Sequence, residues 1–444
     1  MQISREKVRS FVLNHKVLYV LLVFSILNAT LRITGHGMTS VYRLLSPFVF
    51  AGIGLFCWPW FKKEITLGTI AVIYGLTVSV VFYHTISWDM WAFLGYIVIL
   101  YTFVMAIYYT TGDFTEKFLR FLNYTTIVTL VLCWIQFFVR IPYPFLELAH
   151  RPGVNVFMNN ENELAAPLAC MLIIYMYLLF FKKQWKYSFL VVNIAFFLYI
   201  NDAKMSMLGV FLGAAVYVAY AIYVFLRKKF DIKPRTLFAV MCLAFVVGIA
   251  LLCIINPTIK FRDYTLSLKD LALEEILDII LLRPTYGSGG SSIDRTNAII
   301  FGIMELKKTA FFGIGWGNSI DMLAMPEYQL MTAKSMHNLI FQFLTEFGLF
   351  AIVCYVFIFV WLIKRVKSIE KDNVNVMKVA FAVAFVLISS QSSVGILSNY
   401  YMWMVVFYIA LAFKEESEDT KYIDGVSIRG MRGKNRKTNR KITQ

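Results

Sequence analysis

Residues 282–350 read LRPTYGSGGSSIDRTNAIIFGIMELKKTAFFGIGWGNSIDMLAMPEYQLMTAKSMHNLIFQFLTEFGLF, a long polar excursion between apolar runs on either side. The excursion ends at His337, where the next apolar run begins. Ionisable side chains within apolar, membrane-deep regions are costly, and they usually serve a function. We therefore expect the chemistry of the protein to lie in these residues.

The composition places the chain in a lipid bilayer. Of its 444 residues, 59% are hydrophobic and 16% are charged, and the mean hydropathy is +0.66. A soluble domain typically contains about 45–50% apolar residues and about 25% charged residues. In lipid, backbone N–H and C=O groups must pair within helices or within a closed barrel. The apolar runs are about 20 residues long, which predicts an all-α polytopic membrane protein, because barrel strands alternate over about 10 residues.

About twelve runs are long and apolar enough to be transmembrane helices. They cover residues 17–33, 44–61, 65–83, 91–109, 118–139, 164–181, 187–200, 205–226, 237–255, 339–363, 376–397 and 400–413. For the short seventh and twelfth runs, a merged or re-entrant segment is an alternative.

The chain thus divides into four parts. We predict helices 1–9 within residues 1–256, one large extracytoplasmic loop at 257–336, helices 10–12 at 337–413, and a basic disordered cytoplasmic tail at 414–444. The tail is expected to lie near anionic lipid headgroups.

The distribution of Lys and Arg orients these helices. If both termini are cytoplasmic, most of the 43 Lys and Arg residues fall on the cytoplasmic side. Most of the others lie in the long loop, where the positive-inside rule does not count them. The formal charge of +16 is therefore explained by topology, and no nucleic-acid partner is expected.

The cysteines indicate neither a disulfide frame nor a metal site. All six lie inside predicted spans, and no C-x-x-C pair occurs. The outer side also lacks a D-x-D motif that could hold a divalent ion against a nucleotide. We expect packing cysteines, no metal and no cofactor.

Two polar segments before the long loop face outward. Residues 151–166 read RPGVNVFMNNENELAA, in which Asn160 or Asn162 can cap the following helix. Helix capping accounts for these asparagines as well as a functional role does. An arginine on the outer face, such as Arg151, is not explained by the positive-inside rule, because that rule favours basic residues on the cytoplasmic side. Lys204 opens the eighth run, and spacing alone favours a lysine that snorkels to the interface. The alternative is a cation aimed into the same cavity as Arg151.

The long loop contains a candidate phosphate site. Residues 264–282 have the pattern of one or two amphipathic helices at the outer interface. A glycine turn then leads into a serine-capped helix with Asp294 and Arg295 in its first turn. Free amides and a guanidinium fork can bind phosphate there, and the alternative is a capped helix in which Arg295 pairs with an acid. The later GIGWG is interpreted as a turn, since no strand precedes it.

His337 is the strongest catalytic candidate. A lone histidine at a helix start is more often a cap, but this one lies where the long loop returns to the bilayer. Its ordinary pKa of about 6.5 suits a general base. Glu346 lies about two and a half turns further along the same predicted helix, where we expect it to tie helices together.

Several of these residues together resemble the O-antigen ligase and O-antigen polymerase family of bacterial cell-surface polysaccharide assembly. They are Arg151-x-Gly-x-x-x-Phe157-x-Asn159-x-x-Asn162-x-x-Ala165, Lys204, Arg295 ahead of FFGIGWGN, Met336-His337-Asn338, and Leu344-Thr345-Glu346-x-Gly348-Leu349. The resemblance covers about residues 151–350, and the twelve-span layout extends it to the whole chain. The order and spacing of the pieces carry it.

The resemblance implies a metal-independent, multi-helix glycosyltransferase of the bacterial cytoplasmic (inner) membrane, with its active site on the extracytoplasmic face. The family's catalytic histidine falls on His337 and its two key arginines on Arg295 and position 204. Here position 204 is lysine, which supplies a point charge without a bidentate fork. Asn338, Glu346, Asn159 and Asn162 are expected to support the site. The family's Asn-Pro is absent, because Asn160 and Glu161 follow Asn159.

The partners implied by the resemblance are an undecaprenyl-pyrophosphate-linked oligosaccharide and a glycan acceptor. A chain-length regulator and a flippase of the same pathway are further candidates. We favour a polymerase, which joins one lipid-linked repeat unit to another, over a ligase, which moves the finished chain to a terminal acceptor. The departure at Lys204 fits the looser polymerase pattern. A flippase for the same lipid is the rival from another class, although neither an inverted repeat nor a need for the loop supports it. A scaffold protein is a third option.

Overall fold

The structure is a computed structural model that describes part of the chain. The described residues are 73–74, 77–78, 81, 114–139, 153–156, 161–230, 258–261, 264–267, 275–284, 291–315, 317–328, 336–369, 373–390 and 400–411. Four of the expected spans, at residues 17–33, 44–61, 91–109 and 237–255, lie outside them, as does most of the span at 65–83. The expected tail at 414–444 lies outside them as well.

Four described helices are long and apolar enough to cross a membrane. They are α5 (Phe114–Val139), α6 (Glu161–Phe180), α8 (Lys204–Phe230) and α14 (Leu349–Lys367). Three shorter apolar helices are α7 (Ser188–Ile200), which follows the 3-10 turn η2 (Trp185–Tyr187), α15 (Val374–Ile388) and α17 (Tyr400–Leu411). The prediction of a helical membrane protein is confirmed for the described part.

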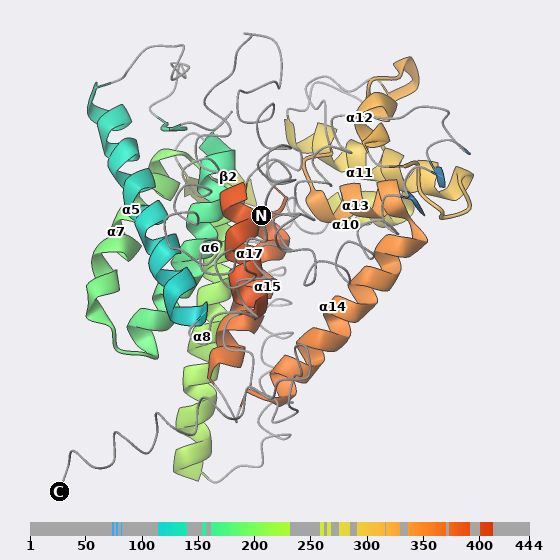
Figure 1. Ribbon diagram of the computed structural model, residues 1–444. Coiled ribbons are helices and arrows are strands. Elements are labelled where there is room, and N and C mark those ends of the chain that lie inside the picture. The colour runs from blue at the N-terminus through green and yellow to red at the C-terminus, as the bar shows by residue number, and fades with distance from the viewer. Residues whose placement is uncertain are drawn as a thin grey trace, which may run out of the picture.

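Helix α6 is the centre of this bundle. It contacts α7, α8, α15 and α17, and most of its side chains are buried (Figure 1). The basic last turns of α8 and α14 lie at the same end of the bundle in Figure 1. The loop helices α11 (Ser291–Lys308) and α12 (Asn318–Leu323) lie towards the opposite end, beside α13 (Leu339–Phe347).

Helices α8 and α15 approach each other closely because α8 carries two glycines on one face. A Cβ atom on Gly209 would lie 2.8 Å from the carbonyl oxygen of Ala384, and one on Gly213 would lie 3.3 Å from that of Ala380. Residues four apart lie on one face of a helix, and small residues there allow such contact in membranes. Because Gly209 precedes Gly213 while Ala384 follows Ala380, the two helices are antiparallel.

The predicted helix over residues 339–363 is wrong as a single element. It breaks at Gly348 into α13 and α14, and the candidate span starts only at Leu349. Gly348 has a φ of +48°, and a Cβ there would lie 2.0 Å from the carbonyl oxygen of Phe311. The backbone of residues 311–313 occupies the space that a continuous helix with side chains would need.

The predicted amphipathic helices over residues 264–282 are only partly confirmed. Strands β1 (Thr258–Phe261) and β2 (Tyr264–Ser267) form an antiparallel hairpin, and helix α10 (Glu275–Leu281) follows. Apolar and polar residues alternate in TIKF and YTLS, and two residues connect them, which is typical of a hairpin. The described part is therefore helical with one two-stranded exception, and the 3-10 turn η4 (Pro326–Tyr328) completes it.

We predict that Gly213→Leu lowers the stability of the bundle. The new side chain would collide with Ile173 of α6, because even a Cβ atom added at position 213 would lie 2.4 Å from its Cδ1. It would also meet the backbone of α15. Overpacking of this kind typically costs about 1–3 kcal/mol. The melting temperature in detergent should fall, whereas Ala215→Leu, the same kind of enlargement at an exposed position of α8, should leave it nearly unchanged. Equal melting temperatures for the two variants would contradict the close contact.

Candidate functional site

The structure describes most of the predicted site residues, but not all. Arg151 and Asn159 lie outside the described residues, and Asn162 is the second residue of α6 and is partly exposed. Lys204 is the first residue of α8, and Arg295 lies in the second turn of α11. Both side chains are partly exposed.

His337 lies just before α13 and is not its cap. The side chain of Asn338 caps the helix, accepting hydrogen bonds from the N–H groups of Ile340 and Phe341 at 3.1 Å each. His337 is partly exposed and has a φ of +48°, in the left-handed region that non-glycine residues rarely adopt. Backbone strain of this kind persists only where the surrounding structure holds it in place, and it clusters at functional sites.

Helix α11 packs against the residues on both sides of His337. A Cβ on Gly302 would lie 2.5 Å from the Cε of Met336 and 2.5 Å from the Oγ1 of Thr345. Arg295 precedes Gly302 by seven residues, about two turns or about 10 Å along the helix. The helix that carries Arg295 is therefore in direct contact with the segment that carries His337.

The start of α8 lies at the same end of the bundle as His337. Gly209 of α8 packs against Ala384 and Ile388 near the end of α15, and the next residue, Ser389, accepts a hydrogen bond from the N–H of Leu339 at 3.0 Å. Because α8 and α15 are antiparallel, Lys204 lies beyond Gly209 towards the α15 end that contacts α13. The structure thus brings together the elements that carry Lys204, Arg295 and His337.

Lys204 makes a weak ion pair. Its Nζ lies 3.7 Å from Oδ2 of Asp202, and 37% of its side chain is exposed. An exposed pair at this distance contributes little to stability.

Glu346 joins α13 to the start of α12. Its carboxylate is fully buried and accepts hydrogen bonds from Ser319 Oγ at 2.5 Å and from Gln342 Nε2 at 2.9 Å, with further backbone bonds from Gly317 and Ser319. Burial raises the pKa of Glu346 from 4.5 to about 7, although these hydrogen bonds oppose the shift. Sequence analysis missed Ser319 and Gln342, since neither belongs to a recognisable motif.

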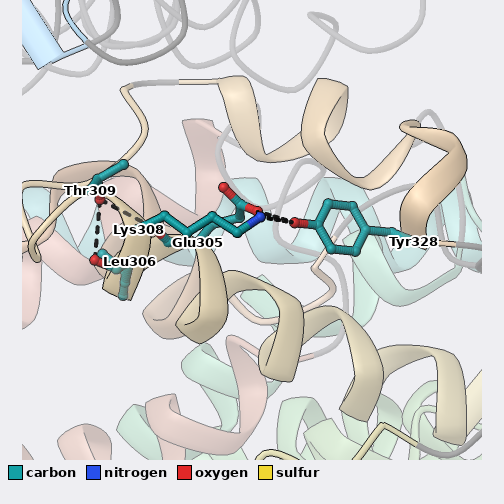
Figure 2. Close-up of polar contacts among 5 residues, drawn as sticks. All are labelled: Glu305, Leu306, Lys308, Thr309 and Tyr328. Atoms are coloured by element: carbon teal, nitrogen blue, oxygen red, sulfur yellow. Dashed lines mark hydrogen bonds and ion pairs between the residues drawn. The ribbon is translucent and has the colours of Figure 1, made fainter.

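A second polar cluster joins α11 to η4. The hydroxyl of Tyr328 donates to Glu305, and Lys308 Nζ lies 2.5 Å from the same carboxylate oxygen (Figure 2). Burial raises the pKa of Tyr328 to about 12, and the hydrogen bond to Glu305 raises the pKa of Lys308. Thr309 closes the end of α11 by bonding to the carbonyls of Glu305 and Leu306. The charges in this cluster satisfy one another, so it anchors the loop.

Within the described residues, no group of three His, Cys, Asp or Glu side chains could hold a metal ion. Cys133, Cys170 and Cys354 are free thiols there.

We predict that Glu346 makes the stability of the protein fall as pH rises. The folded state holds the proton more tightly than the unfolded chain, so this stabilising contribution is complete below pH 4.5 and is lost as pH rises through about 7. The difference is on the order of 3 kcal/mol. In Glu346→Gln, melting curves between pH 5 and 8 should lack this component, whereas Glu116→Gln, which removes an exposed carboxylate, should retain it. Identical pH profiles for wild type and Glu346→Gln would contradict the prediction.

The comparison with known families agrees with this geometry. Residues 189–356 match the model of the O-antigen ligase family. No curated protein matches the chain. The matched segment contains Lys204, Arg295 and His337, together with α11, α12, α13 and the Gly348 break. Residues 189–356 are therefore similar to the O-antigen ligase family, in agreement with the resemblance seen in the sequence.

Proposed function

We propose that the protein is a polysaccharide polymerase that joins undecaprenyl-pyrophosphate-linked repeat units on the outer face of the cytoplasmic membrane. The observation that carries the proposal is the family match over residues 189–356, because this segment contains the candidate base and two candidate phosphate ligands. The contacts among α8, α11, α13 and α15 support it, since they gather these residues at one end of the bundle.

In the proposed reaction, the acceptor hydroxyl oxygen attacks the anomeric carbon of the donor sugar. The bond from that carbon to the pyrophosphate oxygen breaks, the centre is inverted, and undecaprenyl pyrophosphate leaves with the bonding electron pair. His337 accepts the hydroxyl proton, for which a partly exposed imidazole near neutral pH is suited. Arg295, Lys204 and Arg151 stabilise the negative charge that develops on the leaving group, so that the proposed mechanism needs no metal.

The proposed orientation follows from charge. The basic last turns of α8 and α14 lie at the end of the bundle opposite α11, α12 and α13 (Figure 1). Cytoplasmic segments of membrane proteins carry an excess of Lys and Arg. We therefore assign the basic end and both termini to the cytoplasm, and the site to the extracytoplasmic face.

Loss of either principal residue should abolish polymer formation. We expect His337→Ala and Arg295→Ala to lower the rate by about 10²- to 10³-fold, because charge-assisted contacts in a partly dry site are strong. The measurement is the amount of polymer in cells that express each variant, with insertion into the membrane checked by immunoblot. Lys307→Ala removes an exposed cation from the same helix as Arg295 and should leave polymer normal. Normal polymer in His337→Ala would eliminate this residue as the base.

A ligase is the second candidate, since the matched family carries that name. Both reactions need the same donor cations and the same base, so the catalytic residues cannot distinguish them. An incubation that contains the donor but no separate acceptor can. Purified protein incubated with a lipid-linked repeat unit should produce a ladder of longer lipid-linked glycans. Product that forms only after a separate acceptor is added would identify a ligase. Transfer of the lipid across vesicle membranes without any new bond would identify a flippase.

A further inference from the structure

Two buried carboxamides hold a short irregular segment, residues 153–156, between α5 and α7. Asn201, the residue at which α7 ends, accepts a hydrogen bond from the N–H of Val154 and donates one to its carbonyl, both at 2.8 Å. Gln136, near the end of α5, accepts from the N–H groups of Asn155 at 3.1 Å and Val156 at 2.6 Å. It also donates to Oδ1 of Asn155 at 2.8 Å.

These bonds fix a conformation that the segment would not adopt alone. Val156 has a φ of +50°, which is a genuine outlier for a β-branched residue. Such a residue persists only where the surrounding structure determines it more strongly than its own preference. Gln136 and Asn201 are 8% and 6% exposed, so their hydrogen bonds are protected from water. The segment is therefore held rigidly against the ends of both helices.

The same contacts connect the segment to Lys204. Asn201 is followed by a tight corner in which Asp202 has a φ of +50° and its carbonyl accepts the N–H of Lys204 at 2.9 Å. Ala203 is fully buried, and its N–H donates to the carbonyl of Leu198 at 3.2 Å. The position of residues 153–156 is thus fixed relative to the first residue of α8.

We infer that Asn201 and Gln136 are positioning residues for the donor diphosphate. By holding residues 153–156 against the corner at Lys204, they build a fixed wall beside the cation that binds the diphosphate. This inference rests on the proposed function, in which Lys204 contacts that group. Neither carboxamide touches the donor, so both act through the wall and through Lys204.

The chain offers a matched control for Asn201. Asn193 lies within α7, is 7% exposed and joins this helix to α5, since its Oδ1 accepts from Trp134 Nε1 at 2.8 Å. Its Nδ2 donates to the carbonyl of Phe189 at 2.7 Å. Truncation of either asparagine therefore removes a similar set of buried bonds, but only Asn201 contacts residues 153–156.

The experiment measures binding of undecaprenyl pyrophosphate to the full chain in nanodiscs, which requires neither the sugar nor the acceptor. Lys204→Ala should weaken binding, and Asn201→Ala should raise the dissociation constant about tenfold, the order expected when one hydrogen-bonded contact is lost. Asn193→Ala should lose comparable thermal stability and keep the wild-type constant. The double variant Asn201→Ala with Lys204→Ala should bind no more weakly than Lys204→Ala alone, because both changes act on one interaction.

The outcomes separate the two levels of the proposal. If the wild type does not bind undecaprenyl pyrophosphate, or if Lys204→Ala binds it as well as the wild type, the proposed role of Lys204 fails, and the positioning role fails with it. If Lys204→Ala weakens binding while Asn201→Ala behaves like Asn193→Ala, or if the double variant shows additive losses, only the positioning role is overturned. Should Asn201→Ala fail to fold, Gln136→Ala acts on the same segment and should raise the dissociation constant about tenfold as well.

Discussion

Backbone groups that leave a helix inside a membrane protein need partners from the protein itself, and this constraint governs the described structure. Lipid offers no water to unpaired N–H and C=O groups. At the break between α13 and α14, the N–H of Leu349 donates to the carbonyl of Phe311, and the N–H of Ile314 donates to that of Thr345. At the corner between α7 and α8, the side chain of Asn201 performs this task for Val154. Helix ends are thereby tied to neighbouring segments.

This constraint also explains why the candidate site can be rigid although it lies at chain irregularities. Lys204 and His337 lie at the first residue of a helix or just before one, and Arg295 lies in the second turn of α11. The segments next to Lys204 and His337 are hydrogen-bonded to other elements, and α11 packs against Met336 and Thr345 at Gly302. Catalysis by electrostatic stabilisation depends on groups that are already in place before charge develops. In the proposed site, segments that are held by neighbouring elements would meet this condition.

The sequence was informative where structure depends on local properties. Apolar length predicted α5, α6, α7 and α8 within a few residues of their observed ends, because the membrane imposes that length on each helix separately. The break at Gly348 was missed, since it depends on the approach of residues 311–313 from another part of the chain. Glu346 was expected to tie helices together and joins α13 to α12, but its partner Ser319, like the partners of Gln136 and Asn201, was not predicted. A buried polar side chain is recognisable in sequence, but its partner is set by the tertiary fold.

Because position 204 is a lysine and not an arginine, the fixed segment 153–156 beside it matters for the orientation of the proposed ligand. An arginine can orient a diphosphate by itself, because its planar fork donates two parallel hydrogen bonds. An ammonium attracts the same charge from any direction, and it leaves the ligand free to rotate. Orientation must then come from neighbouring groups that cannot move. In the proposed site, residues 153–156 restrict the position of the ligand through their fixed shape, since their N–H groups are already bonded to Asn201 and Gln136, and the point charge of Lys204 provides the attraction.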